Sequence, residues 1–191
     1  MRTPLSKRLK LLIRSWQCFN KRLSKFFLSS HPNSLYQPRF SSRQVLFSWI
    51  GSFLGIAALA YLSVNTKYPL IAAPFGATAV LVFAVPDSPL AQPRNLIGGN
   101  CLGALIAILF VQICGTAPWV IALAVATTIN LMQLTRTLHP PGGAVALVGV
   151  MSGVSWNFLL TPVLAGSIII CLCAVAFNHL TPGRTYPKHW L

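Results

Sequence analysis

The sequence predicts an all-α, polytopic membrane protein with about six crossings, two of them short or broken, arranged as two inverted three-helix repeats. Hydrophobic residues make up 54% of the 191 and charged residues only 8%, a balance that water-soluble domains do not show. Ten of the fifteen Lys and Arg fall within residues 1–43, ahead of a long apolar body. Apolar runs of helix length then follow one another from residue 45 to residue 180.

Residues 1–44 form a basic N-terminal tail and linker. Between residues 5 and 27, apolar side chains recur at steps of three and four, with Lys and Arg largely between them. This pattern predicts an amphipathic helix that lies on anionic lipids. It argues against nucleic acid, which the net charge of +14 would otherwise suggest as a partner. A transit peptide for an organelle is also basic and acid-poor, and this alternative stays open.

The membrane body covers residues 45–180, and residues 181–191 form a short basic C-terminal tail. The run 45–64 is long enough to span ~30 Å of hydrocarbon. The run 71–85 is shorter and contains Pro74 and Gly76, so it predicts a short or broken crossing. Four more runs bring the count to six: 96–113, 119–134, 142–150 and 162–180. Hydropathy leaves open an alternative of four full spans with re-entrant pieces.

The positions of Lys and Arg predict the orientation, because positively charged loops stay in the cytoplasm. Six crossings place the N-terminal tail and four later basic residues on one side, and Lys67 on the other. The four are Arg94, Arg136, Arg184 and Lys188. We therefore expect a multi-pass protein of the bacterial plasma membrane with a cytoplasmic N-terminus. The inner membrane of an organelle is the alternative.

The chain resembles itself at an offset of 67 residues. Residues 74–79 (PFGATA) then align with residues 141–146 (PGGAVA), and four of the six positions are identical. The same offset pairs Gly99 with Gly166 without a gap. Each half has three crossings, an odd number, so the halves insert in opposite orientations. Inverted repeats with broken helices are a common transporter plan, and the substrate binds where those helices meet.

The stretch RTLHPPGGAVALVG, residues 136–149, predicts a helix that begins with unusually bare backbone. Proline is disfavoured inside a helix but suits its first turn, so a helix should begin near Pro141. The first turn carries unpaired N–H groups and a partial positive charge, and Gly142 and Gly143 leave it uncovered. This combination outlines an anion site.

Two stretches, APFGATAVLVFAVPDSPLAQPRNLIGGN and LHPPGGAVAL, resemble the HPP family of integral membrane proteins, named for its His-Pro-Pro motif. The resemblance covers roughly residues 45–180. His139, Pro140 and Pro141 match the name motif, and residues 92–95 match the other segment. Family members in cyanobacteria and chloroplasts are described as nitrite transporters. The resemblance therefore implies a small inorganic anion, nitrite above all, as the substrate.

We expect this anion to bind at the two helix starts and at the cations beside them. The candidate binding residues are Pro74, Gly76, Ala77, Arg94, Asn95, Arg136, His139, Pro140, Pro141, Gly142 and Gly143. The glycines could equally permit close helix packing. For His139, an interfacial capping role is favoured over proton transfer. For Asp87 and Arg94, a surface ion pair is the favoured interpretation.

Enzyme chemistry is not expected, because one acid in the whole chain cannot supply paired general acid and base groups. The five cysteines lack metal-ligand spacing, and we expect neither a metal nor a cofactor. The sequence thus predicts facilitated or channel-like permeation of a small inorganic anion, by a protein that we expect to be a homo-oligomer. The rival prediction is a non-transporting membrane scaffold or sensor whose basic tail binds lipid or a partner.

Overall fold

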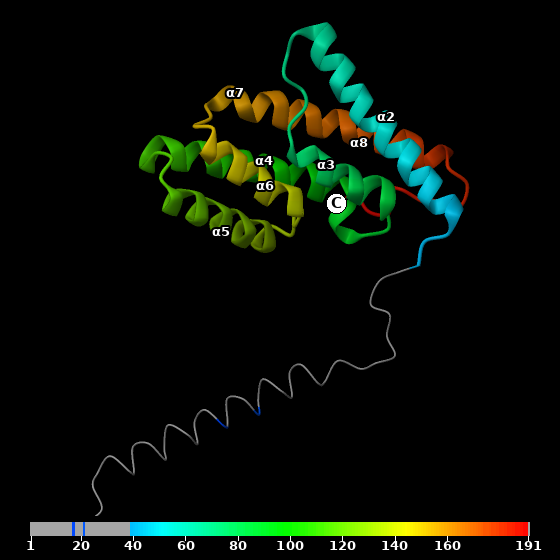
Figure 1. Ribbon diagram of the computed structural model, residues 1–191, viewed down its shortest axis with the longest axis horizontal. Coiled ribbons are helices and arrows are strands. Elements are labelled where there is room, and N and C mark those ends of the chain that lie inside the picture. The colour runs from blue at the N-terminus through cyan, green and yellow to red at the C-terminus, as the bar shows by residue number, and fades with distance from the viewer. Residues whose placement is uncertain (1–16, 18–20, 22–38, 191) are drawn as a thin grey trace, which may run out of the picture. The chain divides into compact units, whose positions relative to one another are not determined.

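The structure is a computed structural model, and it describes Gln17, Lys21 and residues 39–190. Within these residues the regular structure is entirely helical, and six helices form in the compact unit Phe40–Leu191 (Figure 1). The predicted amphipathic helix at residues 5–27 and its lipid contact lie outside the described residues.

The six helices follow the chain in two runs of three. The first run is a long helix, a short one that turns π-helical, and another long one. Its elements are α2 (Ser42–Thr66), α3 (Pro74–Ala79) with η1 (Val80–Ala84), η2 (Pro89–Ala91) in the loop, and α4 (Pro93–Cys114). The second run ends in a helix with a break inside it. Its elements are α5 (Pro118–Leu134), α6 (Pro140–Met151), α7 (Trp156–Phe158), η3 (Leu159–Leu164) and α8 (Ala165–Leu180).

Each predicted apolar run coincides with one of these helices, so the prediction of six helices is confirmed. Three helices are long and apolar enough to cross a membrane: Ser42–Thr66, Pro93–Cys114 and Trp156–Leu180. Three are shorter: Pro74–Ala84, Pro118–Leu134 and Pro140–Met151. The sequence predicts two short segments and the structure has three, because α5 has 17 residues and is only about 25 Å long.

The core has two main clusters. One packs α2, α3 and α8 around Phe75, Phe83 and Ile170, and the other packs α4, α5 and α6 around Ala107 and Ala124. In the second bundle, α4 lies close to α6, at a distance that only glycine permits. A Cβ on Gly103 of α4 would collide with backbone atoms of α6. Small residues allow such close approach in membranes, where packing holds helices together.

Four of the basic residues gather at one end of the helices, which we call the basic end: Arg94, Arg136, Arg184 and Lys188. Hydrogen bonds join this end together. Arg184 donates to the carbonyl of Phe83 at 2.8 Å and lies 3.5 Å from the hydroxyl of Ser48 near the start of α2. Lys67 ends α2 at its other terminus, about 37 Å along the helix axis.

The segment predicted as a C-terminal tail packs back onto the helices through residue 190. Tyr186 is buried, and its hydroxyl donates to the carbonyl of Ala91 at 2.8 Å. Burial raises the pKa of Tyr186, so this donor keeps its proton at any physiological pH. The segment therefore contributes residues to the basic end.

Candidate functional site

Gln92 fixes the start of α4. Its backbone is extended and Pro93 takes the first helical position, where the missing N–H costs nothing. The Nε2 group donates to the carbonyls of Pro86 at 3.1 Å and Ser88 at 2.9 Å. The Oε1 atom accepts from the backbone N–H of Lys188 at 2.9 Å. Both ends of the Gln92 amide are therefore hydrogen-bonded, and these bonds hold the preceding loop and the C-terminal segment to α4.

Arg136 lies in the turn that ends α5. The N–H groups of Arg136 and Thr137 donate to the carbonyls of Gln133 and Met132, at 3.2 and 2.9 Å. With φ at 56° for Arg136, this is a Schellman motif with arginine in place of the usual glycine. A cation at a helix C-terminus is favourable, and the turn exposes its side chain at the basic end.

The start of α4 is joined to this turn by two side chains. Arg94 donates from Nη2 to the carbonyl of Thr135 at 3.0 Å. Asn95 donates from Nδ2 to the carbonyl of Leu138 at 2.9 Å. These bonds bring Arg94, Asn95 and Arg136 together from segments about 40 residues apart. Three of the binding residues predicted from the sequence therefore lie close together at the basic end.

Together they line a cavity of about 250 Å³. Pro89, Gln92 and His189 complete its wall. We call this cavity the basic pocket. Arg94 and Arg136 are both exposed, and each brings a guanidinium group to the pocket. The pocket therefore carries positive charge.

The only acid of the chain does not neutralise these arginines. Asp87 pairs with Lys188 at 2.9 Å, so the predicted ion pair between Asp87 and Arg94 is wrong. Lys188 reaches Asp87 because Gln92 holds the C-terminal segment against the loop. No other Asp or Glu exists in the sequence, so no side-chain carboxylate remains for Arg94 or Arg136.

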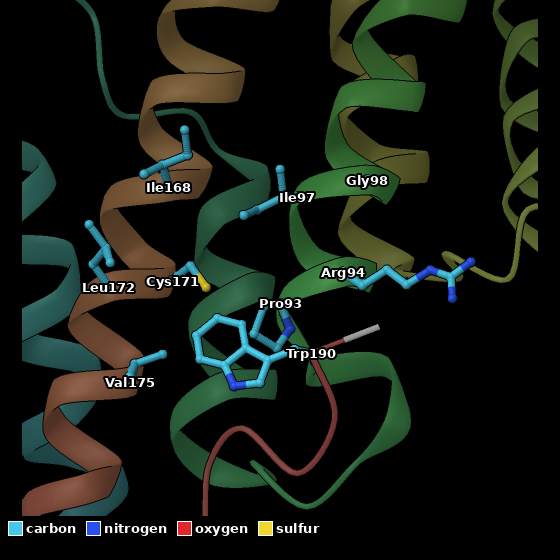
Figure 2. Close-up of a pocket in the computed structure, with 9 residues that line it drawn as sticks. All are labelled: Pro93, Arg94, Ile97, Gly98, Ile168, Cys171, Leu172, Val175 and Trp190. Atoms are coloured by element: carbon cyan, nitrogen blue, oxygen red, sulfur yellow. The ribbon is translucent and has the colours of Figure 1, made fainter.

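A second cavity of about 370 Å³ lies between α4 and α8. Figure 2 shows apolar side chains of both helices facing it, with the indole of Trp190 at one end. The side chain of Arg94 runs away from this groove in the same view. The groove is lined mainly by apolar side chains, and the guanidinium of Arg94 points toward the basic pocket.

His139 is fully buried, and both of its ring nitrogens have partners. Nδ1 lies 2.8 Å from the carbonyl of Leu90, so this nitrogen carries the proton. Nε2 then accepts from the hydroxyl of Thr78, 3.1 Å away. Burial lowers the pKa of His139 to about 4, against a smaller raising effect of the Leu90 carbonyl. His139 thus joins the start of α6 to α3 and to the following loop as a neutral residue.

The two glycines of the motif have different surroundings. A Cβ on Gly142 would collide with the carbonyl of Gly99, and the N–H of Gly142 donates to the carbonyl of His139 at 2.8 Å. Gly142 therefore serves close packing. A Cβ on Gly143 would meet no atom within 4 Å. Only Gly143 keeps the open backbone that the sequence predicts.

The start of α3 lies outside both cavities. Pro74 is buried, whereas Gly76 and Ala77 are exposed, and a Cβ on Gly76 would meet nothing within 4 Å. The N–H of Gly76 already donates to the carbonyl of Ala73 at 3.1 Å. At the start of α6, Pro140 is exposed and Pro141 is buried. The structure thus separates these residues from the basic pocket.

Three residues of the pocket are not among those predicted: Pro89, Gln92 and His189. Gln92 belongs to the stretch that matches the family, and its position before a helix-starting proline was an available signal. His189 gave no signal, because only the folding back of the C-terminal segment brings it to the pocket. Among the described residues, no three His, Cys, Asp or Glu side chains gather where they could hold a metal ion.

Comparison with known proteins places this arrangement in a family. Two proteins of Dictyostelium discoideum, both named only as transmembrane proteins, are 40% and 37% identical to the chain over 160 and 164 residues. These regions cover 77% and 80% of this chain but 56% and 53% of the relatives, so the chain spans about half of their length. No solved structure matches. The family described as "HPP, transmembrane region" matches residues 37–187, and the chain belongs to this family of integral membrane proteins.

Proposed function

We propose that the protein passes small inorganic anions across a membrane, with nitrite as the main substrate. The observation that carries the proposal is the basic pocket, where Arg94 and Arg136 face a cavity of about 250 Å³ with no side-chain carboxylate to neutralise them. Fixed charge of one sign around a concave surface concentrates counter-ions at its mouth. Nitrite is the member of this substrate class that the family resemblance implies.

The basic end faces the cytoplasm in this proposal. Arg94, Arg136, Arg184 and Lys188 gather there, and Lys67 lies at the far end of α2. Positive residues remain on the cytoplasmic side during insertion. The pocket is then the inner mouth of the pathway.

In this proposal the two halves form an inverted repeat, and the pathway lies between α3 and α6. The corresponding helices of the two halves are α2 and α5, α3 and α6, and α4 and α8. Helix α2 packs on α3 and α8, whereas α5 packs on α6 and α4. Each bundle thus takes its third helix from the other half. From starts near the middle of Figure 1, α3 and α6 run in different directions.

Contacts between residues support the same two-fold relation. In such a relation, residues at the repeat offset meet on the axis, and Asn100 donates to Ser167, 67 positions later, at 3.1 Å. The contact of Gly142 with Gly99 corresponds, at this offset, to the contact of Phe75 with Gly166. Lys67 and Arg136, which end α2 and α5, have φ of 60° and 56°, the only positive values outside glycine among the described residues.

Permeation in this proposal needs no coupled proton. The chain has one carboxylate, Asp87, and it is exposed and paired with Lys188. His139 is buried with both ring nitrogens engaged. Facilitated or channel-like passage therefore fits better than proton coupling. An anion would pass from the basic pocket to the start of α6, where Gly143 leaves the backbone open.

Flux into vesicles tests the proposal directly. The purified full-length protein is reconstituted in liposomes, and the entry of nitrite, nitrate and chloride is compared with entry into protein-free liposomes. We expect protein-dependent entry, with nitrite fastest. Entry at the protein-free rate for all three anions would reject transport and favour a scaffold or sensor.

A further inference from the structure

One buried amide side chain, that of Asn100, is incompletely hydrogen-bonded. Gln92, Asn100 and Asn178 are the fully or almost fully buried amide side chains among the described residues. Gln92 uses both ends of its amide, as described above. Asn178 does the same, donating to the carbonyls of Val82 and Ala174 and accepting from Arg184. Asn100 makes one hydrogen bond, and its Oδ1 atom has no partner.

Asn100 lies where the two halves of the molecule meet. On the same face of α4, Leu96 one turn earlier belongs to the cluster of α3 and α8. Ala104 one turn later packs with Val145 of α6 and Val163 of η3. The amide therefore sits among apolar side chains from both halves. An incompletely paired amide in such a place is costly, and polar groups kept inside membrane spans mark substrate pathways.

The one hydrogen-bond partner of Asn100 is Ser167, which the repeat offset of 67 residues relates to it. Ser167 is also fully buried, and its Oγ accepts from Asn100 Nδ2 at 3.1 Å, across exactly one repeat offset. A pair on a pseudo-two-fold axis is reached equally from either side of the membrane. An alternating or symmetric pathway needs its central contact at such a point.

We infer that Asn100 and Ser167 form the central contact for the permeating oxyanion, a role that rests on the proposed function. In the empty protein the two side chains bind each other. With an anion present, the amide turns by half a rotation, so that Oδ1 accepts from the Ser167 hydroxyl and the NH₂ group donates to the anion. The Oδ1 atom, which has no partner in the empty protein, is then hydrogen-bonded.

The charge of the surroundings selects an anion for this site. In the orientation of the empty protein, the free Oδ1 would suit a cation instead. Arg94 lies six residues before Asn100 on α4, about 9 Å along the axis, and Arg136 lies beside it at the basic end. This positive potential repels cations and attracts anions, and the anion, once present, favours the orientation that presents the NH₂ group to it.

Isosteric replacement separates this role from a structural one. Asn100→Leu keeps the number and branching of the side-chain heavy atoms and removes the incompletely paired amide, so the unfolding temperature should hold or rise. Nitrite flux should nevertheless fall by about tenfold or more, because the anion loses a charge-assisted hydrogen bond. Chloride, which gains less from a directed donor, should be affected less, and the selectivity for nitrite should shrink. A merely structural amide would not move this ratio.

Three further variants complete the experiment: a single, a double and a control. Asn100→Ser should reduce nitrite flux, and adding Ser167→Asn should restore it, because the two-fold relation makes the positions equivalent. Thr128→Val is the matched control, since a threonine hydroxyl in a helix can turn to bond the carbonyl four residues earlier. Its flux should be unchanged.

The outcomes distinguish this inference from the proposed function. Suppose the wild type transports nitrite, and Asn100→Leu and Asn100→Ser have the same flux and selectivity as the wild type. This result would overturn the central contact, but the proposed transport function would remain supported. Failure of the swapped pair to recover any flux lost in Asn100→Ser would overturn the symmetric arrangement. An equal loss in Thr128→Val would reduce the effect to general disturbance of the core and overturn the inference. No wild-type flux of any anion would overturn both.

Discussion

His139 of the name motif is held inside the protein as a neutral ring. Its Nδ1–H donates to the carbonyl of Leu90 and its Nε2 accepts from Thr78, so both contacts require one tautomer. Protonation of Nε2 would remove the acceptor that Thr78 uses and place a charge in a buried site beside the start of a helix. The buried site therefore favours the neutral form of the ring that joins α6 to α3.

This arrangement predicts acid sensitivity. The pKa of His139 is lowered by burial from 6.5 to about 4, so between these values the unfolded chain binds more protons than the folded one. The stabilisation is fully present above pH 6.5 and is lost as the pH falls towards 4. It amounts to about 3 kcal/mol, which thermal unfolding in detergent at a series of pH values measures.

His139→Gln should flatten this pH dependence, at a cost in stability at neutral pH. His179→Gln, at the exposed end of α8, is the control and should keep the dependence of the wild type. If His139→Gln unfolds with the same pH profile as the wild type, the acid sensitivity has another source.

The glycine pair of the motif predicts opposite outcomes at adjacent positions. Gly142→Ala places a methyl group against the carbonyl of Gly99, and overpacking of this kind costs about 1–3 kcal/mol. Gly143→Ala points into open space and should cost nothing or gain slightly from helix propensity. Unfolding temperatures of the two variants, measured side by side, test this. Equal destabilisation would mean that the close contact of α4 and α6 is not as described.

Sequence reasoning singled out Arg94 and Arg136 because charge in or near a membrane is rare and its positions are informative, and Asn95 because it follows Arg94 at a predicted helix start. It could not find the partner of Asp87. Charge and proximity favoured Arg94, but the ion pair is set by the C-terminal segment, whose return to the bundle depends on Gln92 and Tyr186. These contacts join residues that are distant in the sequence, so the periodicity of apolar residues cannot predict them.

At the scale of helices, hydrophobic runs gave the number of helices and approximate bounds, because apolar stretches of this length in a membrane must be helical. The last helix begins six residues earlier than predicted, at Trp156, since Asn157 and Thr161 interrupt the apolar pattern. Thr161 has φ −136° and ψ 124°, so the break before Pro162 lies inside the helix and not at its start.

The short helix of the first half is closed by a cation from the other end of the chain. Arg184 donates to the carbonyl of Phe83 and to Oδ1 of Asn178, at 2.8 and 2.9 Å. Arg184→Gln should lower stability by about 1–3 kcal/mol, because a helix end loses a charged donor. Thermal unfolding measures this loss.

Lys188→Gln is the matched control at the same end. It breaks an ion pair that is largely exposed, and exposed pairs contribute about 0–1 kcal/mol. A loss in Lys188→Gln as large as that in Arg184→Gln would contradict the capping role of Arg184.

At the scale of the whole molecule, the account requires that the basic end and Lys67 face opposite sides of the membrane. In a background with the native cysteines replaced, Tyr68→Cys reports on the Lys67 side and Gln133→Cys on the Arg136 side. Both positions are exposed. In intact cells a membrane-impermeant thiol reagent should label Tyr68→Cys and spare Gln133→Cys. Labelling of both would contradict six crossings and the inverted repeat.

The central claim is that the basic pocket collects anions for passage, and the ionic-strength dependence of nitrite flux tests it most directly. Flux into liposomes is measured for the wild type, Arg136→Gln and the control Arg43→Gln, which lies near the start of α2 outside the pocket. At about 10 mM salt, where the Debye length is about 30 Å, we expect Arg136→Gln to be several-fold slower than the wild type. At about 150 mM, where it is about 8 Å, this difference should shrink, with Arg43→Gln close to the wild type throughout. Equal flux of Arg136→Gln and the wild type at both salt concentrations would contradict the claim.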